Sequence, residues 1–213
     1  MRERLYEVFL AFSNVYSGWI LWNLFLAVIP LVLSFWLFRR PKFLAPLFGG
    51  SFGSFFSVFA QRSYLLTDII HLIRGTRAGI SMWVVGLILI PLHITAILGG
   101  FAAYVVSLIN QGYYLRKQGA SRTIIWAVEL LMHLLCAIGV YIGRFRRFNS
   151  WDLVTEPGNV LITTLDDLTS KQPVAVMAIT FVILTVFYWI IKQVTLGLYL
   201  RYRYWRMGKE VLE

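Results

Sequence analysis

The sequence predicts an all-α integral membrane helical bundle of about five transmembrane helices, with an interfacial or soluble loop region, forming a single domain over residues 1–213. Of the 213 residues, 59% are hydrophobic and only 14% are charged, whereas a soluble domain typically has about 45–50% apolar and about 25% charged residues. A soluble protein of this composition would expose more apolar surface than water tolerates. Several uncharged stretches are also long enough to cross the roughly 30 Å hydrocarbon core as helices.

The positions of the basic residues agree with this fold class. The formal net charge is +10, and Lys and Arg gather beside the apolar stretches at 39–42, 116–122 and 201–209. Cationic side chains at the ends of spans meet lipid headgroups and set orientation, so we expect a lipid bilayer and no nucleic acid as partner. With five spans, these three clusters share one face, and the positive-inside rule then predicts a cytoplasmic C-terminus.

The first two predicted spans lie in the N-terminal part of the chain. Residues 18–38 carry no charge, and Arg39 and Arg40 follow them directly. Residues 43–60 are also uncharged but rich in glycine and serine. Small residues let helices approach closely in lipid, so we predict a span there, with a re-entrant segment as the alternative.

The remaining spans are predicted at 80–110, 123–142 and 174–200. The first of these exceeds the thickness of the hydrocarbon core, and no turn cluster divides it, so one tilted helix kinked near Pro91 is expected. The Gly99–Gly100 pair within it is a candidate close-packing face. Residues 143–173 form the longest polar stretch and are predicted to be a loop that holds ordered structure outside the membrane.

A first group of polar residues lies in the segment YLLTDIIHL, residues 64–72. On a helix, Tyr64, Thr67, Asp68 and His71 are three or four residues apart and share one stripe. One interpretation is an interfacial helix end with a hydrogen-bonded Asp–His pair. The other is a proton relay, a ligand site or a metal site, because histidine titrates near neutral pH and binds metals.

A second group is the pair Glu129 and His133, which are four residues apart within the predicted span 123–142. An ionised acid near the centre of a bilayer costs about 3 kcal/mol on the insertion scale. Insertion therefore requires a protonated Glu129 or a partner inside the bundle, for which His133 is the nearest candidate. A functional site and a helix–helix contact both remain open.

His93, two residues after Pro91, completes the histidines of the chain. A site that united the two groups above with His93 would offer ligand types suited to zinc or iron, and two histidines could hold haem. No local motif requires either cofactor, so the cofactor is unknown and metal, haem and pigment all stay open.

The stretch GRFRRFNSWDL, residues 143–153, alternates arginine with aromatic residues. It is either a headgroup anchor or an arginine cluster that holds an anionic lipid, a phosphate-bearing ligand or an acidic partner. Its candidate residues are Arg144, Arg146, Arg147, Asn149, Trp151 and Asp152.

Three sequence blocks carry a family resemblance: WNLFLAVIPL at 22–31, YLLTDIIHL at 64–72 and GRFRRFNSWDL at 143–153. Together they resemble the bacterial integral-membrane family catalogued as domain of unknown function 1361, over roughly residues 18–195. Family members usually have Pro-Asn-x-Pro before the tyrosine, where this chain has AQRS at 60–63, so the family's turn is not transferred. The segments SLINQGYYLR and RFNSWDL are similar to forms from photosynthetic bacteria, and the resemblance implies no activity.

Three functions are compatible with these patterns. The first is an accessory, assembly or scaffold subunit that packs against other membrane proteins, with a photosynthetic complex in a bacterial cytoplasmic or thylakoid membrane as one setting. The second is a proton-coupled or small-molecule transporter with a polar track through Asp68, His71, His93 and Glu129. The third is a membrane enzyme on a lipid or isoprenoid substrate, but no reaction motif is present and we do not expect an enzyme.

Overall fold

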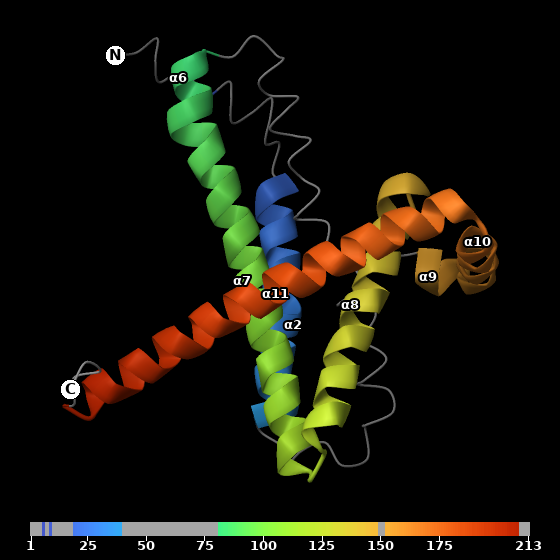
Figure 1. The fold of residues 1–213 in the computed structure, drawn as a ribbon. Coiled ribbons are helices and arrows are strands. Elements are labelled where there is room, and N and C mark those ends of the chain that lie inside the picture. The colour runs from blue at the N-terminus through green and yellow to red at the C-terminus, as the bar shows by residue number, and fades with distance from the viewer. Residues whose placement is uncertain (1–5, 7–8, 10–18, 40–80, 149–151, 209–213) are drawn as a thin grey trace.

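The computed structural model describes residues 6, 9, 19–39, 81–148 and 152–208, and all regular structure within these ranges is helical (Figure 1). The all-α prediction is therefore confirmed for the described part of the chain. The longer helices are α2 (Trp19–Arg39), α7 (Ile90–Lys117), α8 (Arg122–Phe145) and α11 (Lys171–Arg206). The shorter elements are α6 (Met82–Val84), the π-helical turn η5 (Val85–Leu89), α9 (Asp152–Thr155) and α10 (Pro157–Thr169).

The long helices pack in a simple order. Helix α2 lies along α7, α8 turns back beside α7 after a short connection, and α11 contacts both α8 and α7. Figure 1 shows α11 crossing α7 obliquely, with its C-terminal part extending away from the other described helices. Because α11 crosses both helices, it is the element that brings side chains of α7 and α8 into one cluster.

Three helical runs are long and apolar enough to cross a membrane, judged by length and composition: Met82–Lys117, Arg122–Phe145 and Lys171–Arg206. They correspond to the spans predicted at 80–110, 123–142 and 174–200. Helix α2 coincides with the span predicted at 18–38 and is largely apolar, with Arg39 as its last residue. The span predicted at 43–60 lies outside the described residues, so the count of five stays a prediction.

The run Met82–Lys117 is one continuous helical stretch of 36 residues, about 54 Å long. Its irregularity is the π-helical turn Val85–Leu89, which ends immediately before the turn that contains Pro91. Proline lacks an N–H and its ring collides with the carbonyl four residues earlier, and a widened turn relieves that collision. The irregularity predicted near Pro91 therefore takes the form of a π-helical turn.

The polar stretch 143–173 is not an extended loop in its described part. It contains the short helices α9 and α10, and Val160 and Asp167 of α10 are buried. Pro157 opens α10, where its fixed φ suits the first helical turn and its missing N–H would have had no intrahelical partner. The sequence predicted ordered structure here, but the polar composition concealed its helical form.

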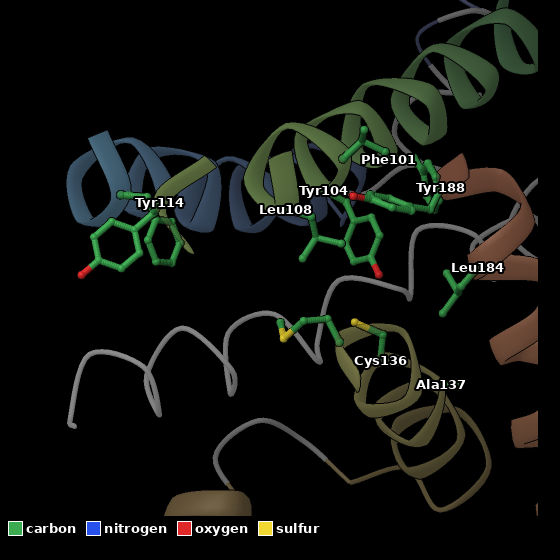
Figure 2. Close-up of a cluster of buried hydrophobic side chains, with 11 residues drawn as sticks. Phe101, Tyr104, Leu108, Tyr114, Cys136, Ala137, Leu184 and Tyr188 are labelled. Atoms are coloured by element: carbon green, nitrogen blue, oxygen red, sulfur yellow. The ribbon is translucent and has the colours of Figure 1, made fainter. Parts of the chain in front are cut away.

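The core lies where α7, α8 and α11 meet, and Figure 2 shows its side chains converging from these helices. Helices α7 and α8 approach closely at Gly112, where an added Cβ would lie 3.3 Å from Ile125 Cγ2 and 3.7 Å from Glu129 Oε1. The close-packing face predicted at Gly99–Gly100 is corrected at Gly99, which is exposed and would place a Cβ in open space. The core residues include Phe101, Tyr104, Leu108, Met132, Cys136, Ala137, Leu184 and Tyr188.

Candidate functional site

The candidate site begins with the buried face of α8. The helix starts after Ser121, whose hydroxyl accepts a hydrogen bond from the Ile124 amide at 3.3 Å. From this start, Glu129 and His133 fall one turn apart on the side of α8 that faces α7 and α11, and both are buried. The two residues that the sequence singled out as a pair therefore lie together on one buried face, and whether this face is a functional site stays a prediction.

Glu129 forms an ion pair with Lys192 of α11, with 2.6 Å between Lys192 Nζ and Glu129 Oε1. The two side chains keep only 11% and 22% of their accessible surface, so the pair is largely removed from solvent. A charge in such surroundings is tolerated only when an opposite charge neutralises it. The partner that the sequence suggested, His133, is corrected to Lys192, because the long lysine side chain reaches across from α11.

His133 is instead hydrogen-bonded through Nδ1 to the hydroxyl of Tyr104 on α7. Its ring also lies against Tyr188 of α11, with 4.6 Å between the ring centroids. Lys192 Nζ lies 5.0 Å from the centroid of the same Tyr188 ring, a cation–π distance. These contacts join α7, α8 and α11 in one polar network, which consists of Tyr104, Glu129, His133, Tyr188 and Lys192.

The hydroxyl of Tyr188 is the unsatisfied group of this network. Tyr188 is 4% exposed, and its hydroxyl has no hydrogen-bond partner among the described residues. The Glu129 carboxylate lies close enough to act on it through its charge and through a hydrogen-bond contact that falls short of standard geometry. A buried hydroxyl without a partner is destabilising.

A separate polar cluster joins α2 to α7, and the sequence analysis did not identify it. Arg39 Nε donates to Asn110 Oδ1 at 2.9 Å, and Asn110 Nδ2 donates to Ser34 Oγ at 3.0 Å. The Arg39 guanidinium also lies 4.6 Å from the centroid of the Tyr113 ring. The available signal was a polar residue, Asn110, at the end of an uncharged stretch. The cluster fixes the register of the two helices.

His93 is buried on α7, and its Nδ1 lies 3.1 Å from the carbonyl oxygen of Leu89 in the π-helical turn. It precedes Tyr104 by eleven residues, about 16 Å along the helix axis, and so stays apart from the polar network. Within the described ranges, no three His, Cys, Asp or Glu side chains are grouped so that they could hold a metal ion. The candidate residues Tyr64, Thr67, Asp68 and His71 lie outside the described residues.

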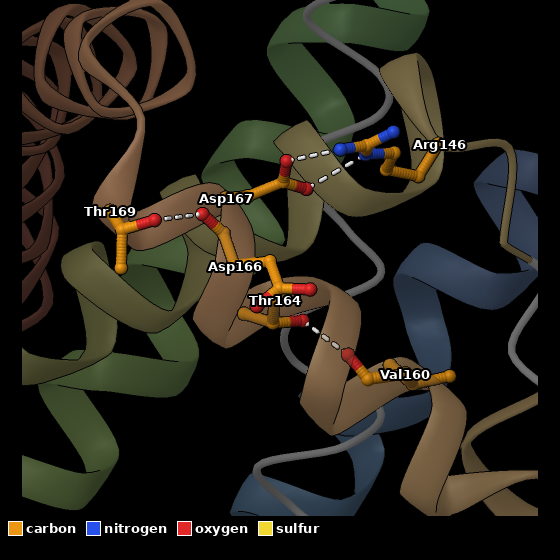
Figure 3. A network of polar contacts seen from close by, with 6 residues as sticks. All are labelled: Arg146, Val160, Thr164, Asp166, Asp167 and Thr169. Carbon is orange, nitrogen blue, oxygen red and sulfur yellow. Dashed lines mark hydrogen bonds and ion pairs between the residues drawn. The ribbon is translucent and has the colours of Figure 1, made fainter.

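One arginine of the cluster that follows α8, Arg146, forms an ion pair with Asp167 of α10. Arg146 Nε donates to Asp167 Oδ2 at 2.8 Å, and a second guanidinium nitrogen pairs with Oδ1, a bidentate contact drawn in Figure 3. Hydrogen bonding from Arg146 lowers the pKa of Asp167 below its ordinary value of 3.8, and the same contact raises the pKa of Arg146. The ion pair between Arg146 and Asp167 therefore holds α10 against the end of α8.

The other members of this cluster surround the end of α8. Arg147 adopts a left-handed backbone conformation with φ of 58°, which terminates the helix in the way glycine commonly does. Arg144 lies in the last turn of α8, and Asp152 begins α9. Asn149 and Trp151 lie outside the described residues. The anionic site predicted for these six residues therefore stays a prediction, with Arg146 paired to Asp167 among its described members.

Comparison with known proteins identifies the family. The family model described as Protein of unknown function (DUF1361) matches residues 22–186. The chain belongs to this family. No curated protein and no solved structure matches the chain. The DUF1361 match contains Tyr104, Glu129 and His133 and ends just before the two network residues of α11, Tyr188 and Lys192.

Proposed function

We propose that this DUF1361 protein is an integral membrane protein that serves as an accessory, assembly or scaffold subunit and packs against other membrane proteins. Three apolar helical runs of sufficient length support the membrane location. The polar network supports a structural role, because the charges of Glu129 and Lys192 neutralise each other inside the bundle. A subunit built in this way presents an almost uncharged outer surface over its spans.

The observation that carries the proposal is the exposure of Trp189. It lies near the middle of α11, about 26 Å from either end, and 61% of its surface is accessible. Tryptophan in membrane proteins prefers the two interfaces, so lipid alone gives no reason for an exposed Trp189 in mid-helix. Large aromatic side chains are instead enriched at the centres of protein–protein contacts. Phe187, 48% exposed, extends this aromatic surface.

Purification in a mild detergent, followed by identification of co-purifying proteins, tests this function. We expect a defined membrane-protein partner whose recovery falls about tenfold in Trp189→Ala, as for loss of an aromatic anchor. Trp205→Ala is the matched control, because Trp205 is also exposed, at 74%, but lies in the last turn of α11, where an interfacial position explains it. Recovery of the chain only as a free monomer or homo-oligomer contradicts the proposal. An absorbance spectrum of the complex tests the photosynthetic setting.

A second candidate function, proton-coupled transport, is favoured by the unsatisfied Tyr188 hydroxyl beside Glu129. Ionisable groups inside membrane proteins mark proton and ion pathways in many transporters. The test is pH-driven flux in proteoliposomes, which Glu129→Gln abolishes if the carboxylate carries the proton. Flux that is unchanged in Glu129→Gln removes this candidate and leaves the subunit role.

A further inference from the structure

The contacts between helices determine which helix ends share one side of the molecule. Arg39, at the end of α2, reaches Asn110 near the end of α7, so these helices run in the same direction. Helix α8 returns beside α7. Helix α11 pairs its Lys192 with Glu129 near the start of α8, so its C-terminal part lies toward that end. The ends of α2, α7 and α11 and the start of α8 therefore lie on one side, which we call the basic end.

The basic end carries a concentrated positive charge. It holds Arg39, Arg116, Lys117 and Arg122 and the three arginines in the last turns of α11, while the charge of Glu129, farther along α8, is neutralised by Lys192. On the opposite side, between positions 144 and 171, four basic residues are matched by four acidic residues. The described charges thus sum to +7 on one side and to zero on the other, and this asymmetry favours an anionic partner at the basic end.

The three arginines of α11 have the geometry of a headgroup contact. Arg201, Arg203 and Arg206 are exposed, and none has an ion-pair partner in the described part of the chain. At about 100° per residue, Arg203 and Arg206 lie about 60° apart on one face of the helix and Arg201 lies on the opposite face, whereas a helix lying flat on a membrane keeps its cations on one face. The exposed aromatic residues Tyr202 and Trp205 are interleaved with them, and aromatic residues mixed with arginine mark the level of the interface.

We propose that the basic end binds the headgroups of anionic phospholipids, with Arg201, Arg203 and Arg206 as the principal contacts. This inference rests on the membrane location proposed above. Guanidinium groups bind phosphate oxygens through paired hydrogen bonds, and cations on two opposite faces of the helix suit an end that passes through the headgroup layer. The bound leaflet is then the cytoplasmic one, in accordance with the positive-inside rule.

Native mass spectrometry of the full-length chain, with phosphatidylglycerol or phosphatidylcholine titrated into neutral detergent, tests the lipid site. We expect phosphatidylglycerol to bind more tightly, and Arg201→Gln/Arg203→Gln/Arg206→Gln to weaken it about tenfold. Replacing the same three residues by lysine keeps most of the preference. The control Lys171→Gln removes an exposed cation from the opposite side and leaves phosphatidylglycerol binding unchanged.

Equal binding of the two lipids, or an unchanged phosphatidylglycerol affinity in the triple variant, overturns the inference. If the triple variant fails to fold, two other measurements test the inference. Phosphatidylglycerol binding must weaken in the single variant Arg206→Gln, and it must weaken in the wild type as the salt concentration rises. Recovery of the wild type as a folded soluble protein without detergent is a different failure, because it refutes the proposed membrane location itself. A membrane protein with no lipid preference refutes only the lipid site.

Discussion

At the scale of single residues, the polar network is held by partners that come from different helices. Glu129 of α8 and Lys192 of α11 neutralise each other's charge, and the hydroxyl of Tyr104 on α7 is hydrogen-bonded to His133 on α8. Each contact gives a costly polar group a partner where water is scarce. The same contacts specify how three largely apolar helices, which offer few other directional interactions, pack against one another.

The Glu129–Lys192 pair predicts a strong coupling between two substitutions. Lys192→Met alone leaves the carboxylate without its counter-charge and is expected to lower the free energy of unfolding by about 3 kcal/mol. Glu129→Gln/Lys192→Met removes both charges and should recover most of that loss. Unfolding in detergent mixtures measures all four members of the cycle. Additive effects of the two single changes would show that the charges do not depend on each other.

Tyr104 and Tyr188 offer a matched pair of hydroxyl deletions in the same network. Tyr104→Phe removes the hydrogen bond to His133 and should lower the free energy of unfolding by about 1 kcal/mol. Tyr188→Phe removes a buried hydroxyl that has no partner among the described residues and should leave stability unchanged or raise it. Thermal unfolding midpoints compare the two variants. The reverse order of stabilities would contradict the assignment of the hydrogen bonds.

At the scale of elements, the sequence predicted the apolar helices well because hydrophobic composition and missing charge are local signals. Their ends were less predictable. Helix α11 continues to Arg206, beyond the predicted end at 200, since basic residues are favourable at a helix C-terminus. Helix α10 was not predicted as a helix, because its segment is polar. Its position depends on the contact between Arg146 and Asp167.

The contact between Arg146 and Asp167 predicts a pH-dependent attachment of α10. Because the pKa of Asp167 is lower in the folded protein than its ordinary 3.8, the pair stabilises the fold above that value. The stabilisation is lost as the pH falls through the lowered pKa. The difference in thermal midpoint between wild type and Asp167→Asn should therefore be largest at neutral pH and shrink as the pH falls below 3.8.

Asp166→Asn is the control for this pH dependence. Asp166 is the neighbouring acid on the same helix, but it is exposed, and its side chain forms no hydrogen bond or ion pair among the described residues. Its removal should leave the pH profile unchanged. A constant difference between wild type and Asp167→Asn over the whole pH range would contradict the role of the ionised pair.

At the scale of the whole molecule, the sequence indicated the fold class and two of the five residues of the polar network. Glu129 and His133 stood out because ionisable residues are rare in apolar spans. Lys192 was an equally visible exception in the stretch 174–200, but its pairing with Glu129 depends on how α11 crosses α8. Partners that lie 63 residues apart in sequence are set by packing, which no local pattern records.

The central claim is that lipid surrounds the apolar helices and that α11 crosses the bilayer. It is tested most directly by labelling single cysteines in sealed vesicles with a membrane-impermeant maleimide, in a Cys136→Ser background that removes the one native thiol. Suitable positions are Leu161→Cys in α10, Phe187→Cys in the middle of α11 and Trp205→Cys at its end, which are all exposed in the structure. We predict that the first and last positions label from opposite sides of the membrane and that Phe187→Cys labels only after detergent is added. Equal labelling of all three from one side of intact vesicles would contradict the claim.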